Sequence, residues 1–179
     1  HSTPRGIYIY FIIIEKFWWV PLLGGGIWLL VRGTEEKDIL PPVQSGTQTF
    51  HRELTQGVND ILVSFLDWWD IYGTFDITVV KPDGGLRTED VQWGLYQRGA
   101  SKAKNLAETA HGHAAALDLA PYRRIGGLLQ PDWKDIAGFN IIGKAAEDFG
   151  LDWGGRWTSF KDLSHVEVPG WRSFPIVSR

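Results

Sequence analysis

The stretch TAHGHAAALDLA, residues 109–120, joins side chains that can bind a metal to a predicted structural element. Apart from Asp118, its second half consists of alanine and leucine, and we expect a short strand over Ala116–Ala120. His111 and Asp118 lie on either side of the point where this strand begins. The stretch therefore indicates both a sheet and a site of chemistry.

The apolar pattern on both sides of this strand predicts helices mixed with a few short strands. Apolar residues at three- and four-residue steps from Leu54 to Trp69 are typical of a helix that buries one face and ends before Gly73. Further expected elements are a strand over Thr74–Lys81, a helix from Thr88 to Arg98, a helix from about Pro131 to Phe149 and a strand over His165–Val168. Few strands among unevenly spaced helices predict an α+β fold.

The composition excludes several classes of protein. The chain of 179 residues is long enough for one domain with a core. Its net charge of −3 and pI near 5.9 provide no basic field for nucleic acid. Hydrophobic residues at 44% fit a globular protein and exclude a disordered chain. Because there is no cysteine, any metal ion must be held by His, Asp or Glu.

The N-terminal segment, residues 1–33, differs from the rest of the chain. Residues 7–31 are mostly apolar but are interrupted by a charged pair, a proline and three glycines. Two interpretations stay open: a weak membrane anchor, or strands that dock the chain in an assembly such as a virion. Residues 34–46 are polar and contain two prolines, which predicts a linker. The catalytic or binding domain is then expected over residues 47–179.

The residues that can bind a metal are concentrated in two segments, residues 109–118 and 162–167. A hydrolytic zinc site needs three nitrogen or oxygen ligands, an open position for water and a carboxylate that moves protons. The two segments contain such a set, with His111, Asp118 and His165 as ligands and Asp162 as the carboxylate. The spacing alone does not decide between this site and ordinary polar residues.

Three other polar residues are interpreted from their neighbours in the sequence. Strand alternation places Glu167 on the same face as His165, where its carboxylate can orient that ring from behind. The position of His113 does not fit the ligand spacing, and His51 lies at the start of the first predicted helix. We therefore interpret both of these histidines as structural or surface residues.

Five blocks of the chain resemble the zinc peptidases that cut the stem peptides of peptidoglycan. They are Gly85–Glu89, Leu95–Ser101, His111–Asp118, Trp153–Trp157 and Asp162–Glu167, in the order found in that family. The family includes D-alanyl-D-alanine carboxypeptidases of the vancomycin-resistance type and L-alanyl-D-glutamate endopeptidases of phage endolysins. The resemblance covers roughly residues 50–171. It implies the α+β fold that these peptidases share with the Hedgehog signalling domain, a small antiparallel sheet with helices packed on it.

The resemblance also implies roles for individual residues. The residues that match the family's zinc ligands are His111, Asp118 and His165. Asp162 matches the acid–base residue, and Asp at this position is more similar to the phage endopeptidases. Arg87 resembles the family arginine that binds substrate or steadies the developing oxyanion, a task suited to a guanidinium.

Three positions near these residues are of interest. Thr109 replaces the usual serine and can keep its hydroxyl, and Trp153 is expected in the core or in the wall of the substrate cleft. Ala114 stands where the family has glycine. If the backbone has a positive φ there, the alanine strains the ligand loop by about 1 kcal/mol or more.

The function implied is zinc-dependent hydrolysis of an amide bond in the peptidoglycan stem peptide, with L-alanyl-D-glutamate endopeptidase as the leading hypothesis. Such a metallopeptidase acts at the bacterial cell wall, in the periplasm or outside the cell. Two alternatives stay open. One is a D,D-carboxypeptidase, and the other is a non-catalytic wall-binding or virion structural module whose site has degenerated.

Overall fold

The structure is a computed structural model, and it describes residues 48–177. The apolar segment 1–33, its proposed contacts through residues 7–31 and the linker 34–46 lie outside the described residues. Within residues 48–177, no helix is both long enough and apolar enough to cross a membrane.

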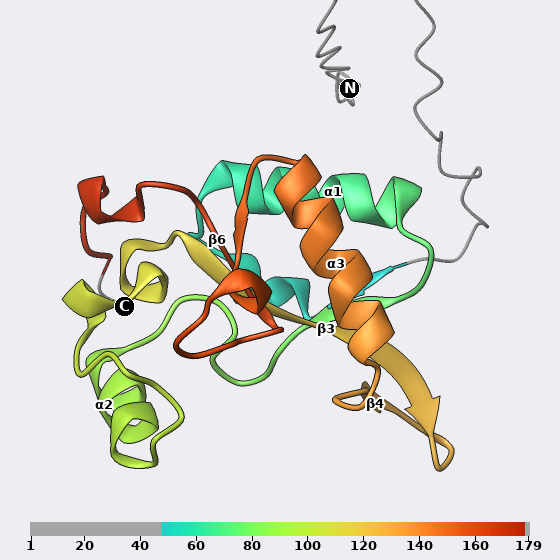
Figure 1. Cartoon of the computed structure of the whole chain (residues 1–179), viewed down its shortest axis with the longest axis horizontal. Coiled ribbons are helices and arrows are strands. Elements are labelled where there is room, and N and C mark those ends of the chain that lie inside the picture. Colours follow the sequence, from blue (N-terminus) through green and yellow to red (C-terminus); the bar gives the residue numbers. More distant parts are fainter. Residues whose placement is uncertain (1–47, 178–179) are drawn as a thin grey trace, which may run out of the picture. The chain divides into compact units, whose positions relative to one another are not determined.

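A mixed sheet and α-helices make up the described part of the chain (Figure 1). The strands are β1 (Thr49–Phe50), β2 (Ile77–Val79), β3 (Ala116–Ile125), β4 (Leu128–Pro131), β5 (Asp152–Trp153) and β6 (His165–Glu167). The α-helices are α1 (Asp60–Tyr72), α2 (Glu89–Gln97) and α3 (Ile136–Asp148). The predicted α+β class is confirmed.

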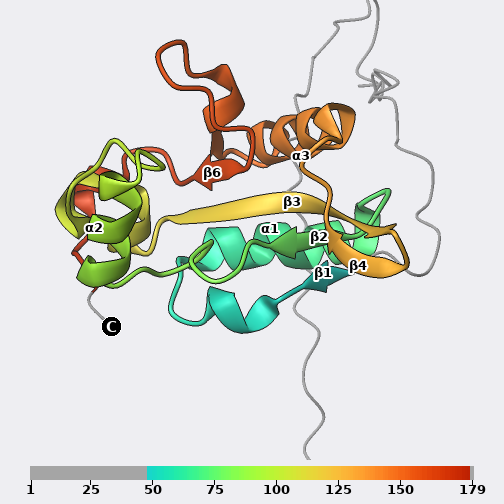
Figure 2. The ribbon, with the colours of Figure 1, turned by 90° about the horizontal axis from the view of Figure 1, so that it is seen from below.

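The long strand β3 is the centre of the sheet. The strand order is β1-β2-β3-β6-β5, and β4 pairs with β3 as well. The β1–β2 pair is parallel, whereas the other pairs are antiparallel. Because β3 pairs with both β2 and β6, segments far apart in the sequence meet on it, as Figure 2 shows.

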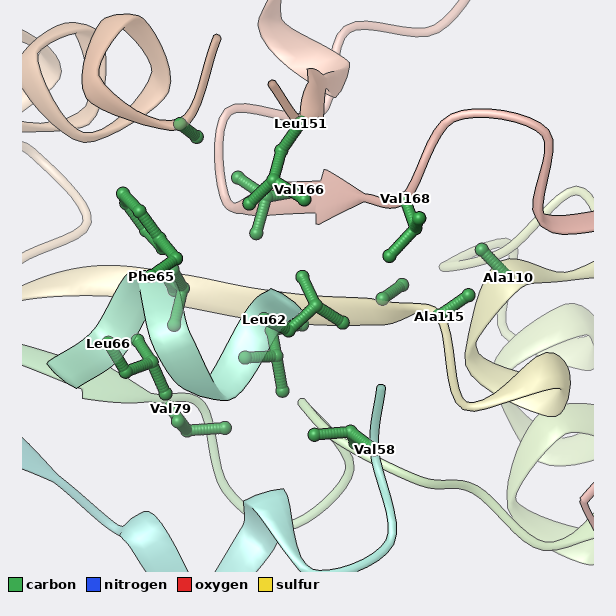
Figure 3. Packing of buried hydrophobic residues seen from close by; sticks show 14 of the residues in the cluster. Val58, Leu62, Phe65, Leu66, Val79, Ala110, Ala115, Leu151, Val166 and Val168 are labelled. Atoms are coloured by element: carbon green, nitrogen blue, oxygen red, sulfur yellow. The ribbon is translucent and has the colours of Figure 1, made fainter. Parts of the chain in front are cut away.

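One face of the sheet forms the core with α1 and α3. Leu117 and Leu119 of β3 and Val166 of β6 are fully buried on this face. Figure 3 shows Leu62 and Phe65 of α1 in the same cluster as Val166. Because side chains alternate along a strand, the residues between these apolar ones lie on the opposite face of the sheet.

The helix α1 forms because its apolar residues recur at helical spacing. Its buried residues are Leu62, Phe65, Leu66 and Trp69. The side chain of Asn59 caps its first turn by accepting a hydrogen bond from the amide of Ile61 at 3.1 Å. The helix therefore begins at Asp60, later than the expected start near Leu54, because residues 52–55 form a separate 3-10 turn.

The last α-helix also begins later than predicted. The expected start was about Pro131, but this residue ends β4, and α3 begins at Ile136 after the cap residue Asp135. Asp135 accepts a hydrogen bond from the amide of Gly138 at 2.8 Å, which stabilises the first turn.

A β-hairpin that the sequence analysis did not predict extends β3 beyond the sheet. The turn between β3 and β4 consists of Gly126 and Gly127, whose positive φ values of 60° and 87° favour glycine. Leu128 at the start of β4 is 71% exposed. In Figures 1 and 2 this hairpin lies at the end of β3 opposite α2.

Candidate active site

Asp118 and His165 meet on the face of the sheet opposite the core. They are direct partners in the β3–β6 ladder, between residues that point into the core. His111 joins them from the short 3-10 helix Ala110–His113, which precedes β3. Each of the three residues offers one ligand atom, and these atoms all lie within 4.8 Å of one another. The structure thus brings together the residues predicted as ligands.

His111 is held so that one ring nitrogen faces this cluster. Its Nδ1 lies 2.8 Å from the carbonyl oxygen of Gly85, to which it can donate only as N–H. That tautomer leaves Nε2 as a lone-pair donor, 3.3 Å from Oδ1 of Asp118. This Nε2 is buried without a hydrogen-bond partner among the described residues. A buried nitrogen of this kind suits a metal ion.

His165 is oriented by a carboxylate behind it. Its Nε2 lies 3.0 Å from Oε2 of Glu167, and its Nδ1 lies 3.2 Å from Oδ1 of Asp118. If Nε2–H donates to Glu167, the lone pair of Nδ1 faces the cluster. A carboxylate that holds a ligating imidazole in this way is a recurrent arrangement at metal sites.

Asp118 divides its two carboxylate oxygens between the histidines and Arg87. Its Oδ2 accepts a 2.6 Å hydrogen bond from Nη2 of Arg87, and the two side chains are only 13% and 10% exposed. Arg87 also donates from Nε to the carbonyl of Asp83 and from Nη1 to Oε1 of Gln92. All three guanidinium nitrogens therefore have acceptors in the protein, and Arg87 fixes the orientation of Asp118.

The charges of the cluster are strongly coupled. Burial lowers the pKa of His111, which keeps this ring neutral near neutral pH. Burial alone would raise the pKa of Asp118, but His111, His165 and Arg87 hold it well below its usual range. Burial would lower the pKa of His165, yet its hydrogen bonds to Asp118 and Glu167 raise it to about 9. Without a metal ion, the carboxylate of Asp118 therefore pairs with the protonated ring of His165, in place of the metal cation.

The donor set fits a zinc ion. Two imidazoles and one carboxylate are the common ligands of a catalytic zinc with an open fourth position. The orphaned Nε2 of His111 and the convergence of the three side chains are independent observations that agree with this set.

Asp162 lies beside the cluster in the loop that leads into β6. Its Oδ1 accepts hydrogen bonds from both the amide and the hydroxyl of Ser164, at 3.2 and 2.8 Å. These bonds fix the side chain, and Asp162 lines the same cavity as His165. A carboxylate in this position can exchange a proton with a molecule bound at the cluster.

The cluster opens into a cavity of about 710 Å³. Its walls include the cluster itself together with Arg87, Thr109, Asp162 and Glu167. Trp157 also lines it, with its ring 5.0 Å from that of His165. A cavity of this volume is large enough for a peptide segment.

The remaining residues singled out from the sequence have structural surroundings. Trp153 is buried and does not line the described cavity, and its indole N–H donates to the carbonyl of Leu163 at 2.9 Å. It thereby anchors the loop between Asp162 and His165. His113 is also buried, with Nδ1 2.6 Å from the carbonyl of Phe174. His51 lies outside the cavity, near the ring of Tyr122.

Ala114 has the backbone conformation that was expected to strain it. Its φ of 55° and ψ of 24° lie in the left-handed region, which costs a residue with a Cβ about 1–2 kcal/mol. The amide of Ala114 donates to the carbonyl oxygens of Ala110 and His111, and its carbonyl accepts from the amide of Asn59 at 2.7 Å. These bonds hold the strained turn, and the ligand cluster stays assembled.

Two residues near the site were not found from the sequence. Gln92 is fully buried, and its side chain connects Arg87 to Ser101 and to the carbonyl of Ala103. Trp133, two residues after the end of β4, also lines the cavity. A single glutamine in an amphipathic helix and a tryptophan in a loop carry no local signal for such positions.

Taken together, the fold and the cluster have the form of a metal-dependent hydrolase domain. The comparisons with known proteins specify the class further. A family model described as D-alanyl-D-alanine carboxypeptidase matches residues 102–168. The predicted resemblance to the peptidoglycan peptidase family is confirmed.

Two known proteins are similar to this chain. The peptidoglycan L-alanyl-D-glutamate endopeptidase CwlK of Bacillus subtilis (strain 168) is 27% identical over 101 residues, which are 47% of this chain and 57% of CwlK. The chain thus matches little more than half the length of that relative. The crystal structure of the Serratia marcescens L-Ala D-Glu endopeptidase ChiX matches with a TM-score of 0.51 and 23% identity, over 74% of this chain and 93% of ChiX. This second likeness concerns the fold.

Proposed function

We propose that this protein is a zinc-dependent peptidase that cleaves the peptidoglycan stem peptide between L-alanine and D-glutamate. The observation that carries the proposal is the convergence of His111, Asp118 and His165 in a cavity that Asp162 also lines. The name of CwlK supports this choice of bond. The setting we propose is cell-wall lysis of the phage type, outside the cytoplasm.

The bound zinc would supply Lewis-acid polarisation of the scissile carbonyl and activation of a water molecule. Asp162 accepts a proton from the attacking water as the new C–O bond forms. It then delivers this proton to the amide nitrogen as the C–N bond breaks, so that the amine leaves neutral. The hydrogen bonds from Ser164 keep the Asp162 carboxylate in one position during both transfers.

The residues behind the ligands keep the cluster ready for this reaction. Glu167 holds the ring of His165 through Nε2, and Gly85 holds the ring of His111 through Nδ1. Arg87 restrains the carboxylate of Asp118. The same guanidinium borders the cavity, and we infer that it also attracts the negative charge that develops on the scissile oxygen.

A D,D-carboxypeptidase is the second candidate, and the description of the matching family model favours it. The two activities leave different products. An endopeptidase releases a fragment that begins with D-glutamate, whereas a carboxypeptidase releases free D-alanine. Mass spectrometry of a digested soluble stem peptide therefore decides between them.

The test of the proposed function is the zinc content of the purified full chain, measured beside its digestion of peptidoglycan. We expect about one zinc per chain, and we expect His165→Ala to lose both the metal and the digestion. The matched control is His51→Asn, because His51 lies outside the cavity and asparagine tolerates its left-handed backbone. Wild-type protein without zinc and without digestion would refute the proposal and favour a wall-binding or structural module.

A further inference from the structure

The cavity that holds the ligand cluster continues to Trp133. The cavity is lined by Leu95 of α2 and by residues 100–103 after that helix, and also by Trp133, which follows β4. Figures 1 and 2 both place α2 and β4 at opposite ends of β3, and Asp118 lies between these ends. A ligand bound across the cluster therefore has room on both sides of it.

Trp133 lines the cavity as an exposed side chain, and its indole N–H has no hydrogen-bond partner among residues 48–177. Its ring stacks on that of Phe139 of α3, with centroids 6.0 Å apart and an interplanar angle of 24°. The residue is 55% exposed although it is part of the cavity wall. The buried Trp69 and Trp153 donate their indole N–H to carbonyl oxygens, but no hydrogen bond within residues 48–177 uses that of Trp133.

The backbone on both sides of Trp133 is fixed. The amide of Asp132 donates to the carbonyl of Pro121 at 2.8 Å, and the side chain of Asp132 accepts from the amide two residues later. Asp135 caps α3 and pairs with Arg123 at 2.7 Å. The indole is thus a platform held in place before any ligand arrives, which lowers the entropic cost of binding.

We propose that Trp133 is a subsite for a sugar ring of the glycan strand to which the stem peptide is attached. An indole face suits the C–H face of a pyranose, and its N–H can donate to a ring substituent. The inference rests on the proposed function, because a peptidase that cuts next to the first amino acid of the stem peptide has the sugar just beyond the scissile bond. Trp133 lines the same cavity as the ligand cluster but is not part of the cluster. A sugar bound to it would therefore lie beside the scissile bond.

The test compares two soluble substrates that share one stem peptide, of which one carries the disaccharide of the glycan strand. We expect the full-length zinc protein to have a kcat/KM about three- to tenfold higher for the glycosylated substrate. Trp133→Ala should abolish this preference and leave hydrolysis of the free peptide unchanged, and Trp133→Phe should retain part of it. Trp93→Ala is the matched control, because Trp93 is 48% exposed but does not line the cavity.

Two results would overturn the sugar subsite: wild-type protein without any preference, or Trp133→Ala lowering kcat/KM equally for both substrates. The second result would mean that Trp133 contacts the peptide or another partner. If wild-type protein hydrolyses neither substrate, the proposed function fails, and calorimetric binding of the glycosylated peptide then decides the subsite. Tighter binding by wild type than by Trp133→Ala would still support it, whereas equal or absent binding would refute it.

Discussion

Proton release should accompany the binding of zinc to the metal-free protein, and His165 should be its source. The pKa of this ring is raised to about 9, so below that pH it carries a proton that a metal ion must displace. His111 contributes little, because burial lowers its pKa, and Asp118 is already ionised. We therefore expect about one proton per zinc ion at about pH 6, where a zinc-bound water with a pKa of about 7 is still largely protonated.

The size of the pH effect on zinc affinity follows from the pKa of the same ring, His165. The ring is about half protonated at pH 9 and almost fully protonated at pH 7, so competition from this proton should lower the apparent zinc affinity about 50-fold between these two pH values, or by about 2.3 kcal/mol. The raised pKa also means that the ion pair of His165 stabilises the metal-free fold below about pH 6.5. This contribution is lost as the pH rises through about 9. Zinc-free protein should then become less stable while its affinity for zinc increases.

Calorimetry in two buffers with different ionisation enthalpies counts the released protons directly. Glu167→Gln should shift the release to lower pH, because Glu167 is one of the two carboxylates that raise the pKa of His165. Glu147→Gln is the matched control, since Glu147 lies on the surface beside Arg156. Release of no proton, or of two protons, at about pH 6 would refute the assigned charges of the cluster.

Three further predictions concern other parts of the site and the fold. Asp162→Asn should lower peptidoglycan hydrolysis at least about 100-fold and leave the zinc content unchanged, with Asp152→Asn as the control; loss of zinc would show that Asp162 is a ligand. Arg87→Met should lower the free energy of unfolding of the metal-free protein by about 3 kcal/mol, because Asp118 then has one cationic partner fewer. Urea denaturation measures this loss, and a value below about 1 kcal/mol would contradict a buried ion pair. Gly143→Ala should destabilise the protein by about 1–3 kcal/mol, since its Cβ would overlap the ring of Trp153, whereas Gly94→Ala in α2 should be neutral or stabilising. Thermal denaturation of both variants checks this contrast, and equal melting temperatures would contradict it.

The sequence predicted the elements whose signals are local. The spacing of apolar residues in α1, the threonine cap of α2 and the alternation around His165 are each contained within one element. Asp118 and His165 could be predicted as ligands because each is a polar residue within an otherwise buried strand. That pattern is readable before the pairing of the strands is known.

The rest depended on tertiary contacts that leave little trace in the sequence. The two-residue strands β1 and β5 exist because longer strands lie beside them. The sequence predicts a helix start at about Pro131, a position that suits proline, but the glycine turn before β4 directs this residue into a hairpin. The pairing of Arg87 with Asp118 likewise joins residues 31 positions apart. The spacing of apolar residues along the sequence carries no information about such contacts.

The exposed hairpin has a consequence for handling the protein in solution. Among the described strands, β4 has only β3 as a neighbour, so its outer edge offers free backbone groups beside the exposed Leu128 and Leu129. An uncovered edge that carries leucines can pair with the same edge of a second molecule. Preparations of residues 48–177 at high concentration should therefore self-associate through β4, and a lysine at position 128 should keep them monomeric.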